Sequence, residues 1–315
     1  MIRIFIIRFF FFIMALFIFQ NCNRKSKKID TGDTPFYGLI HISVDESFKP
    51  VIEEEIQMYE ASYPGTKIIA HYKPEAECFR DLLKDSINRL VIVTRGLTLK
   101  EEQYYMDSLG YNPGWNQVAT DAITIIVNAA SNDTLFTISR LQKQLTGNLF
   151  RDQNIVFDGL KATSTVRFIS DSILHNEKFD SSVVKAANNS REVINYVASH
   201  ENAIGLVGIS WIGNPEDTIH LNLLKKVKIC YVECNKCFGS PYVKPMQESI
   251  LSNRYPLVRG LYYVLKENYR GLGTGFVSFL KSERGQLIFK RSYLRPVMGF
   301  AVRSVKINQS LKKIK

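Results

Sequence analysis

The sequence predicts an α/β fold in which strands and helices alternate along a chain of 315 residues. Short runs of branched apolar residues are followed by segments whose apolar residues recur at helical spacing. No internal repeat or low-complexity segment interrupts this order. Such alternation is typical of one or two doubly wound parallel sheets, which bind ligands at the carboxyl ends of their strands, where helices begin.

Branched apolar runs predict the strands, and apolar residues at helical spacing, as at Val51, Ile52, Ile56 and Tyr59, predict the helices. In chain order the first elements are the strand Gly38–Val44, a helix from Ser47 to the Pro64-Gly65 break, the strand Thr66–Tyr72, the helix Glu75–Asp85, the strand Arg89–Val93 and the helix Leu99–Leu109, which ends at Gly110. Then follow the strand Ala122–Asn128, helices at Ile138–Leu145, Thr165–Leu174 and Ser190–Ser199, strands at Ala203–Val207, Val227–Val232 and Leu257–Leu265, and helices over about 272–291.

The first 22 residues predict export from the cytoplasm. Residues 1–21 contain no acid, and their apolar run from Phe9 to Phe19 is too short to span a bilayer, which takes about 20 residues. Cys22 follows directly, so residues 1–22 resemble a bacterial lipoprotein signal in which Cys22 becomes the lipidated first residue. Larger residues replace the small ones usual before that cysteine, and an uncleaved membrane anchor is the alternative.

The net charge of +11 comes from the two ends of the chain. Six of the 41 basic residues precede Asp30 and five follow Val302, so the body balances 30 basic against 30 acidic residues. This distribution argues against nucleic-acid binding. It favours a flexible tether at 23–36 beside a membrane and a basic tail at 303–315.

Four further cysteines, Cys78, Cys230, Cys234 and Cys237, leave three possibilities open. An oxidising compartment favours one disulfide among them, and buried free thiols are the second possibility. A metal site is the third, although the C-x3-C-x2-C run lacks the second pair of ligands usual for zinc. No metal site is therefore predicted.

Three predicted strand-to-helix turns carry groups suited to an anion. They contain Ser47-Phe48, Thr94-Arg95, and Thr163-Ser164-Thr165 followed by Arg167. Helix N-termini expose unpaired N–H donors, and arginine binds oxyanions through paired donors. The hydroxyls also suit ordinary helix caps, and Arg95 could instead pair with Glu101 or Glu102.

No catalytic motif accompanies these turns. The chain contains no G-x-S-x-G or H-E-x-x-H motif and no nucleotide-binding phosphate loop, and its five histidines are scattered. We therefore predict neither enzyme activity nor a cofactor. A phosphatase would need a metal or nucleophile cluster that the sequence does not show.

These turns and several later segments resemble the phosphate-binding proteins of bacterial phosphate ABC transporters, the PstS-like periplasmic receptors. The likeness covers nearly all of residues 37–302. It is carried by ESFKPV (46–51), IVTRGLTLKEE (92–102), TDAITIIVN (120–128), TSTVRFISDSIL (163–174), AIGLVGISWI (203–212), YPLVRGLYYVLKE (255–267) and FLKSERGQLIFKRSYLRPV (279–297). The last two segments are the most specific.

The resemblance implies a type II-like periplasmic-binding-protein fold of two α/β lobes, each a doubly wound sheet, joined by two crossover hinge segments. Lobe 1 would comprise 37–118 and 245–302, and lobe 2 would comprise 119–244. A monomer would bury the anion between the lobes and close by a hinge motion. The implied ligand-binding residues are Ser47, Phe48, Thr94, Arg95, Thr163, Ser164, Thr165 and Arg167.

The chain departs from the family pattern in three places. Arg95 stands where the second turn usually has an aspartate, which accepts a proton from hydrogen phosphate and so rejects sulfate. The segment 73–77 replaces an expected serine turn. The arginine usual before the hydroxyl cluster is absent near Gly159, and Arg167 is the expected substitute.

The sequence therefore predicts a periplasmic, membrane-anchored lipoprotein. Its expected role is to capture an inorganic oxyanion, foremost phosphate, and deliver it to the permease of an ABC transporter. The alternative is a sensor or envelope interaction protein that has lost anion binding on the same scaffold.

Overall fold

The computed structural model describes residues 32–85, 87–149, 152–159, 163–175, 177–214 and 216–300. The predicted signal with Cys22, most of the predicted tether at 23–36 and the basic tail at 303–315 lie outside the described residues. The chain divides after Asp33 into two units, and the sheet and helices belong to the second unit, which begins at Thr34. The end of the predicted tether belongs to this second unit. There the Pro35 carbonyl accepts a hydrogen bond from the Tyr59 hydroxyl.

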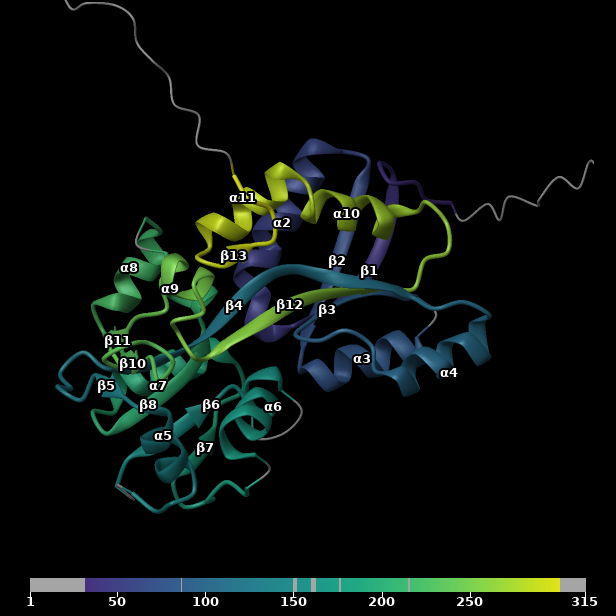
Figure 1. Cartoon of the computed structure of the whole chain (residues 1–315). Helices are drawn as coiled ribbons and strands as arrows, with labels where there is room; N and C mark the ends of the chain where they lie inside the picture. The colour runs from purple at the N-terminus through teal and green to yellow at the C-terminus, as the bar shows by residue number, and fades with distance from the viewer. Residues whose placement is uncertain are drawn as a thin grey trace, which may run out of the picture. The chain divides into compact units, whose positions relative to one another are not determined.

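In the described residues, a mixed sheet of ten strands forms the centre of the fold (Figure 1). Its order is β2-β1-β3-β12-β4-β8-β6-β7, and β13 and β9 also pair with β4. Its strands are β1 (Gly38–Asp45), β2 (Thr66–Lys73), β3 (Asn88–Val93), β4 (Gly114–Asn128), β6 (Asn154–Phe157), β7 (Val184–Ala186), β8 (Ala203–Gly208), β9 (Val227–Ile229), β12 (Val258–Leu265) and β13 (Arg295–Pro296). A second sheet joins β11 (Tyr242–Val243), β10 (Tyr231–Glu233) and β5 (Leu135–Phe136).

The large sheet is parallel at its two ends and antiparallel in its middle. Strands β2, β1 and β3 run parallel, as do β7, β6 and β8, whereas β12 and β4 pair antiparallel with their neighbours. The predicted α/β class is confirmed, and the sheet is mixed rather than parallel throughout, because β12 and β4 run between the two parallel parts. We call β2, β1, β3 and β12, each with the turn and helices that follow it in the chain, the first half, and β8, β6 and β7, again with the elements that follow them, the second half.

Strand β4 links the two halves. It pairs with β12 as far as Ala122 and with β8 from Ile123 onward. The prediction of a strand beginning at Ala122 was too short, because β4 begins at Gly114. The lobe boundaries predicted near residues 118 and 244 stay a prediction.

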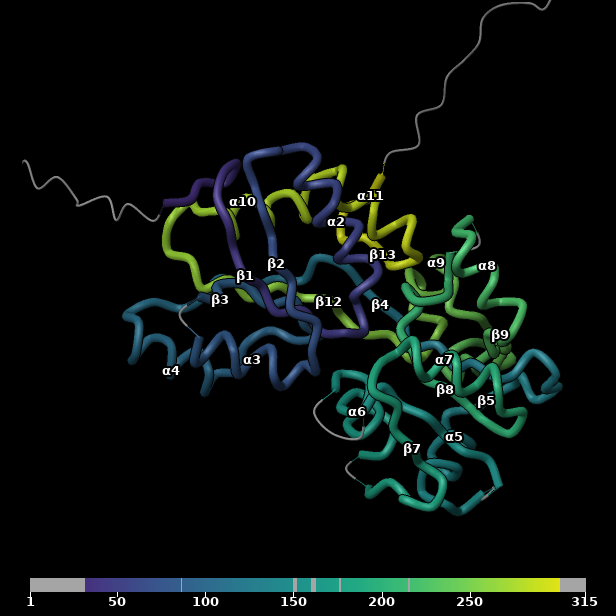
Figure 2. Tube along the Cα trace, turned by 180° about the vertical axis from the view of Figure 1, so that it is seen from behind, coloured from purple at the N-terminus to yellow at the C-terminus, as the bar shows by residue number. Residues whose placement is uncertain are grey.

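Helices cover both faces of the first half, as two opposite views show (Figures 1 and 2). One face carries α2 (Lys49–Ser62), α10 (Leu272–Leu280) and α11 (Glu283–Arg291), and the other carries α3 (Glu75–Lys84) and α4 (Leu99–Leu109). The remaining helices are α5 (Ile138–Leu145), α6 (Ser164–Ile169), α7 (Ser190–Ser199), α8 (Thr218–Leu224) and α9 (Gln247–Leu251). No helix among the described residues combines the length and apolar character needed to cross a membrane.

Local capping explains why several helices begin where the sequence predicts. The side chains of Thr98, Thr137 and Asn189 accept hydrogen bonds from the first turns of α4, α5 and α7. These bonds satisfy N–H donors that have no partner within a helix. Gly110 then ends α4 with a φ of 75°, a left-handed conformation that glycine adopts without strain.

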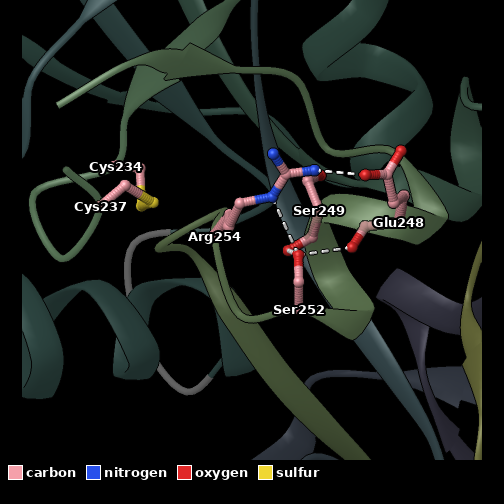
Figure 3. The surroundings of a disulfide bond; sticks show 6 residues. All are labelled: Cys234, Cys237, Glu248, Ser249, Ser252 and Arg254. Carbon is pink, nitrogen blue, oxygen red and sulfur yellow. Dashed lines mark hydrogen bonds and ion pairs between the residues drawn. A yellow bond between two sulfur atoms is a disulfide. The ribbon is translucent and has the colours of Figure 1, made fainter. Parts of the chain in front are cut away.

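Cys234 and Cys237 form a disulfide, whereas Cys78 and Cys230 are buried free thiols. The structure thus combines two of the three possibilities left open by the sequence. In the part of the chain that the structure describes, no group of three or more His, Cys, Asp or Glu could hold a metal. Figure 3 shows the disulfide in the loop after β10, with Arg254 turned toward Glu248 and Ser252.

We expect this disulfide to contribute modestly to stability. The cysteines are only 3 positions apart, so the bond restricts a short loop in the unfolded chain. A closed loop of this length corresponds to about 2 kcal/mol in the chain-entropy model. The double variant Cys234→Ser/Cys237→Ser should lose about that much unfolding free energy in urea titrations. Loss of cooperative unfolding would contradict the expectation.

Candidate anion site

Hydroxyl groups predicted from two separate turns converge where the two halves of the sheet meet. Ser47 lies in a 3-10 turn, Glu46–Phe48, directly after β1, and Ser164 and Thr165 begin α6. Ser47 Oγ lies 3.4 Å from Ser164 Oγ and 3.5 Å from Thr165 Oγ1. All three side chains are fully buried. We call Ser47, Ser164 and Thr165 the hydroxyl cluster.

Asp158, which follows β6 directly, joins the hydroxyl cluster. Its Oδ2 accepts hydrogen bonds from Ser47 Oγ and Thr165 Oγ1, each at 3.2 Å. Burial raises the pKa of Asp158, and the positive charge of Arg259 opposes this rise. Thr163 acts mainly as the cap of α6, because its Oγ1 accepts from the Val166 N–H at 3.2 Å.

The arginine at the hydroxyl cluster is Arg259, which the sequence prediction did not include. It lies in β12 directly opposite Asp121 of β4, and its Nε donates to Asp121 Oδ2 at 2.9 Å. Its Nη1 donates to Ser164 Oγ at 2.9 Å and to Thr165 Oγ1 at 3.3 Å. The side chains of Arg259 and Asp121 are 2% and 0% exposed, so this ion pair is shielded from water.

One nitrogen of Arg259 has no acceptor. Its Nη2 is buried and lacks a hydrogen-bond partner among the described residues. Gly208, the last residue of β8, has no side chain beside Nη2. A Cβ on this residue would stand 3.4 Å from Nη2 and would fill the space next to it. The Phe48 ring lies 5.0 Å from the guanidinium carbon and supports the group from one side. Buried N–H donors rarely stay unpaired, so Nη2 is suited to one further oxygen ligand.

Asp45 adds a third carboxyl group at the end of β1. Its Oδ1 accepts from the Ser47 N–H at 2.9 Å. Burial, reinforced by the negative charge of Glu75, raises the pKa of Asp45 to about 7. Burial also raises the pKa of Asp121, with Arg259 opposing it. The raised pKa favours the protonated form of the Asp45 carboxyl, which can donate a hydrogen bond to an oxygen ligand.

Thr94 and Arg167 meet at Glu75, the first residue of α3. The Thr94 N–H and Oγ1 donate to Glu75 Oε1 at 2.8 and 2.5 Å. Arg167 Nε donates to Glu75 Oε2 at 2.6 Å, and Arg167 Nη2 donates to Thr94 Oγ1 at 2.6 Å. Although burial opposes it, hydrogen bonding from Arg167 and Thr94 holds the pKa of Glu75 below its usual value. Arg167 therefore bonds Glu75 and Thr94, and among the described residues the structure does not bring it to the hydroxyl cluster.

Arg95 is engaged elsewhere. Its Nη1 and Nη2 donate to the two carboxylate oxygens of Glu101 at 2.7 and 2.9 Å, and its guanidinium carbon lies 3.8 Å from the centre of the Phe79 ring. The pairing with Glu101 that the sequence left open is the one found. In the described part of the chain, the structure does not bring Arg95 to the hydroxyl cluster.

A family model described as a PBP superfamily domain matches residues 29–284. The chain belongs to this family. No curated protein sequence matches it. Among solved structures, a Clostridium perfringens protein described as a phosphate ABC transporter substrate-binding protein, with bound phosphate, is 19% identical with a TM-score of 0.67, over 83% of this chain and 100% of its own.

Other structures with this fold come from different classes of protein. An ABC-type phosphate transport receptor from Vibrio cholerae is 18% identical with a TM-score of 0.59, covering 81% of this chain and 99% of its own. The regulatory domain of MetR, a LysR family regulator from N. meningitidis, is 11% identical with a TM-score of 0.52, covering 83% and 100%. At these identities the likeness shows the fold alone, and it confirms the predicted type II periplasmic-binding-protein fold.

Proposed function

We propose that this protein is an extracytoplasmic solute-binding receptor that captures an inorganic oxyanion, with phosphate as the first candidate, for an ABC permease. The observation that carries the proposal is Arg259 Nη2, a buried cationic donor without a partner among the described residues. The same guanidinium already contacts Ser164 and Thr165. Arginine and hydroxyl donors are the groups that bind tetrahedral oxyanions in proteins. Membership of the binding-protein family supports the proposal.

Binding would be coupled to separation and closure of the two halves. Ser47 belongs to the first half, and Ser164 and Thr165 belong to the second. Because all three are fully buried, an anion reaches them only when the halves move apart. Its oxygen atoms would then replace direct contacts such as Ser47–Ser164. By bonding to both halves, the anion would keep them closed after a hinge motion.

We propose further that the receptor is a periplasmic monomer anchored through a lipid on Cys22. A tether keeps a receptor close to a membrane permease and raises its local concentration without a strong binding interface. Mass spectrometry of the mature N-terminus tests this part. A mature chain that still contains residues 1–21 would contradict it.

Calorimetry on the protein lacking residues 1–22 tests anion binding directly. Phosphate or sulfate should give a saturable heat and raise the melting temperature, because both present oxygens to Arg259. A bulky phosphate ester, such as glycerol phosphate, should bind far more weakly, because the hydroxyl cluster is enclosed. Absence of binding with every anion at low salt would overturn the proposed function.

A second candidate is a sensor or envelope interaction protein that does not bind anions. Glu75 favours this candidate, because its carboxylate already uses the donors of Thr94 and Arg167. The two candidates differ in the calorimetric experiment. A protein of the second kind should show no heat with phosphate or sulfate while remaining folded.

A further inference from the structure

The Glu75 carboxylate accepts hydrogen bonds from donors that are chemically suited to an oxyanion. Its two carboxylate oxygens receive the Thr94 N–H, the Thr94 hydroxyl and Arg167 Nε, and Arg167 Nη2 lies 3.4 Å from Oε1. A carboxylate presents two oxygens much as one edge of a tetrahedral oxyanion does, and both are bound by paired charge-assisted donors. The side chain of Glu75 is 4% exposed, so the contact is enclosed.

The position of Glu75 connects this contact with the hydroxyl cluster. Glu75 belongs to α3 in the first half, whereas Arg167 belongs to α6, the helix that begins with Ser164 and Thr165. The bond between them therefore joins the same two halves as the Ser47–Ser164 contact. The charge of Glu75 also acts beside the hydroxyl cluster, because it contributes to the raised pKa of Asp45, whose Oδ1 accepts a hydrogen bond from the Ser47 N–H.

We infer that Glu75 is a specificity-determining residue, an internal carboxylate beside the anion site that selects the bound oxyanion by its charge. The inference rests on the proposed function. A fixed negative charge about 10 Å from a bound anion weakens binding by roughly tenfold for each unit of ligand charge when the effective dielectric constant is about 20. By this effect Glu75 lowers the affinity for doubly charged tetrahedral oxyanions more than for singly charged ones, such as dihydrogen phosphate.

Two tetrahedral ions of nearly equal size separate charge from shape: perrhenate carries one negative charge and molybdate carries two. Glu75→Gln keeps the size of the side chain and removes its charge. We expect this variant to bind molybdate up to roughly a hundredfold and perrhenate up to roughly tenfold more tightly than the wild type, because the lost repulsion scales with the charge of the ion. Calorimetry with both ions, on protein lacking residues 1–22, measures the two affinities.

Glu77→Gln is the matched control. Glu77 lies two residues along the same helix turn, pairs with Arg80 at 3.4 Å and is 43% exposed, so water screens its charge. This variant should bind both ions as the wild type does. Equal gains for Glu75→Gln and Glu77→Gln would overturn the inference, because they would reflect net charge alone.

The outcomes separate the inference from the proposed function. A selective molybdate gain over a wild type that itself binds anions supports the inference, whereas a folded wild type that binds no anion overturns the proposed function and the inference with it. Wild-type phosphate binding that Glu75→Gln leaves unchanged overturns the inference and keeps the proposed function. Equal gains for both ions, or no binding by either folded protein, overturn it as well and leave Glu75 and Arg167 as a structural ion pair.

A second variant covers the case in which Glu75→Gln does not fold, which circular dichroism would show. Arg167→Gln removes the cation that neutralises Glu75 and should change selectivity in the opposite direction, weakening molybdate more than perrhenate. An equal loss for both ions would overturn the inference.

Discussion

Replacement of Arg259 by methionine should abolish anion binding and lower the free energy of unfolding by about 3–5 kcal/mol. The large loss of stability is expected because Asp121, which is fully buried, would keep its charge without its partner. Binding should fail because Ser164 and Thr165 lose their donor and the unpaired Nη2 disappears. Calorimetry with phosphate and urea unfolding measure the two effects separately.

Two further variants separate loss of binding from loss of stability. Adding Asp121→Asn to Arg259→Met removes the second buried charge, so the double variant should regain most of the lost stability and still not bind phosphate. Arg95→Ala removes a cation that pairs with Glu101, and phosphate affinity should stay unchanged. Phosphate binding by the double variant, or its loss in Arg95→Ala, would show that Arg259 does not hold the anion.

The parts of the fold that the sequence predicts well are those decided by neighbouring residues. The helices α4, α5 and α7 begin after Thr98, Thr137 and Asn189 because each cap bonds a backbone group three residues away. Strand pairing is decided by distant residues and was predicted less well. The expected strand Val227–Val232 is divided at Cys230, because β9 pairs with β4 and β10 pairs with β5 and β11 in another sheet.

The candidate site shows the same difference between features decided by neighbouring residues and features decided by distant ones. The turns at Ser47 and Thr163–Thr165 carry a local signal, a hydroxyl at a helix start, and the structure brings them together. Arg259 was missed because its partner Asp121 lies 138 positions away in the chain. An available signal was a single arginine within the apolar run Val258–Leu265, since a buried strand retains a charge only where an opposite charge meets it. Glu75 lies in the segment 73–77, which the sequence marked only as replacing an expected serine turn, because an acidic residue at a helix start is common on any surface.

Replacing Glu55 by methionine should stabilise the protein by about 1–3 kcal/mol at neutral pH. Glu55 lies on the buried side of α2 between Ile52 and Tyr59, and both its carboxylate oxygens lack a hydrogen-bond partner among the described residues. Burial, with a smaller contribution from Glu54, raises its pKa well above the usual value. Methionine has a similar length and carries no charge, so it fills the same space without the cost of burying a carboxylate. Urea unfolding of both proteins at pH 7 measures the gain.

The pH dependence of that gain distinguishes a buried carboxyl from a simple packing effect. A carboxyl whose pKa is raised by folding stabilises the fold only while it is protonated, so its contribution is lost as pH rises from its unfolded pKa of about 4.5 toward its folded pKa. Glu55→Met should therefore gain most near pH 7 and little near pH 4. Glu53→Met is the control, because Glu53 on the same helix is 46% exposed and its removal should change stability by less than about 0.5 kcal/mol. A gain equal at both pH values would mean that methionine acts by packing alone, and a loss of stability would mean that Glu55 has a partner that this fold depends on.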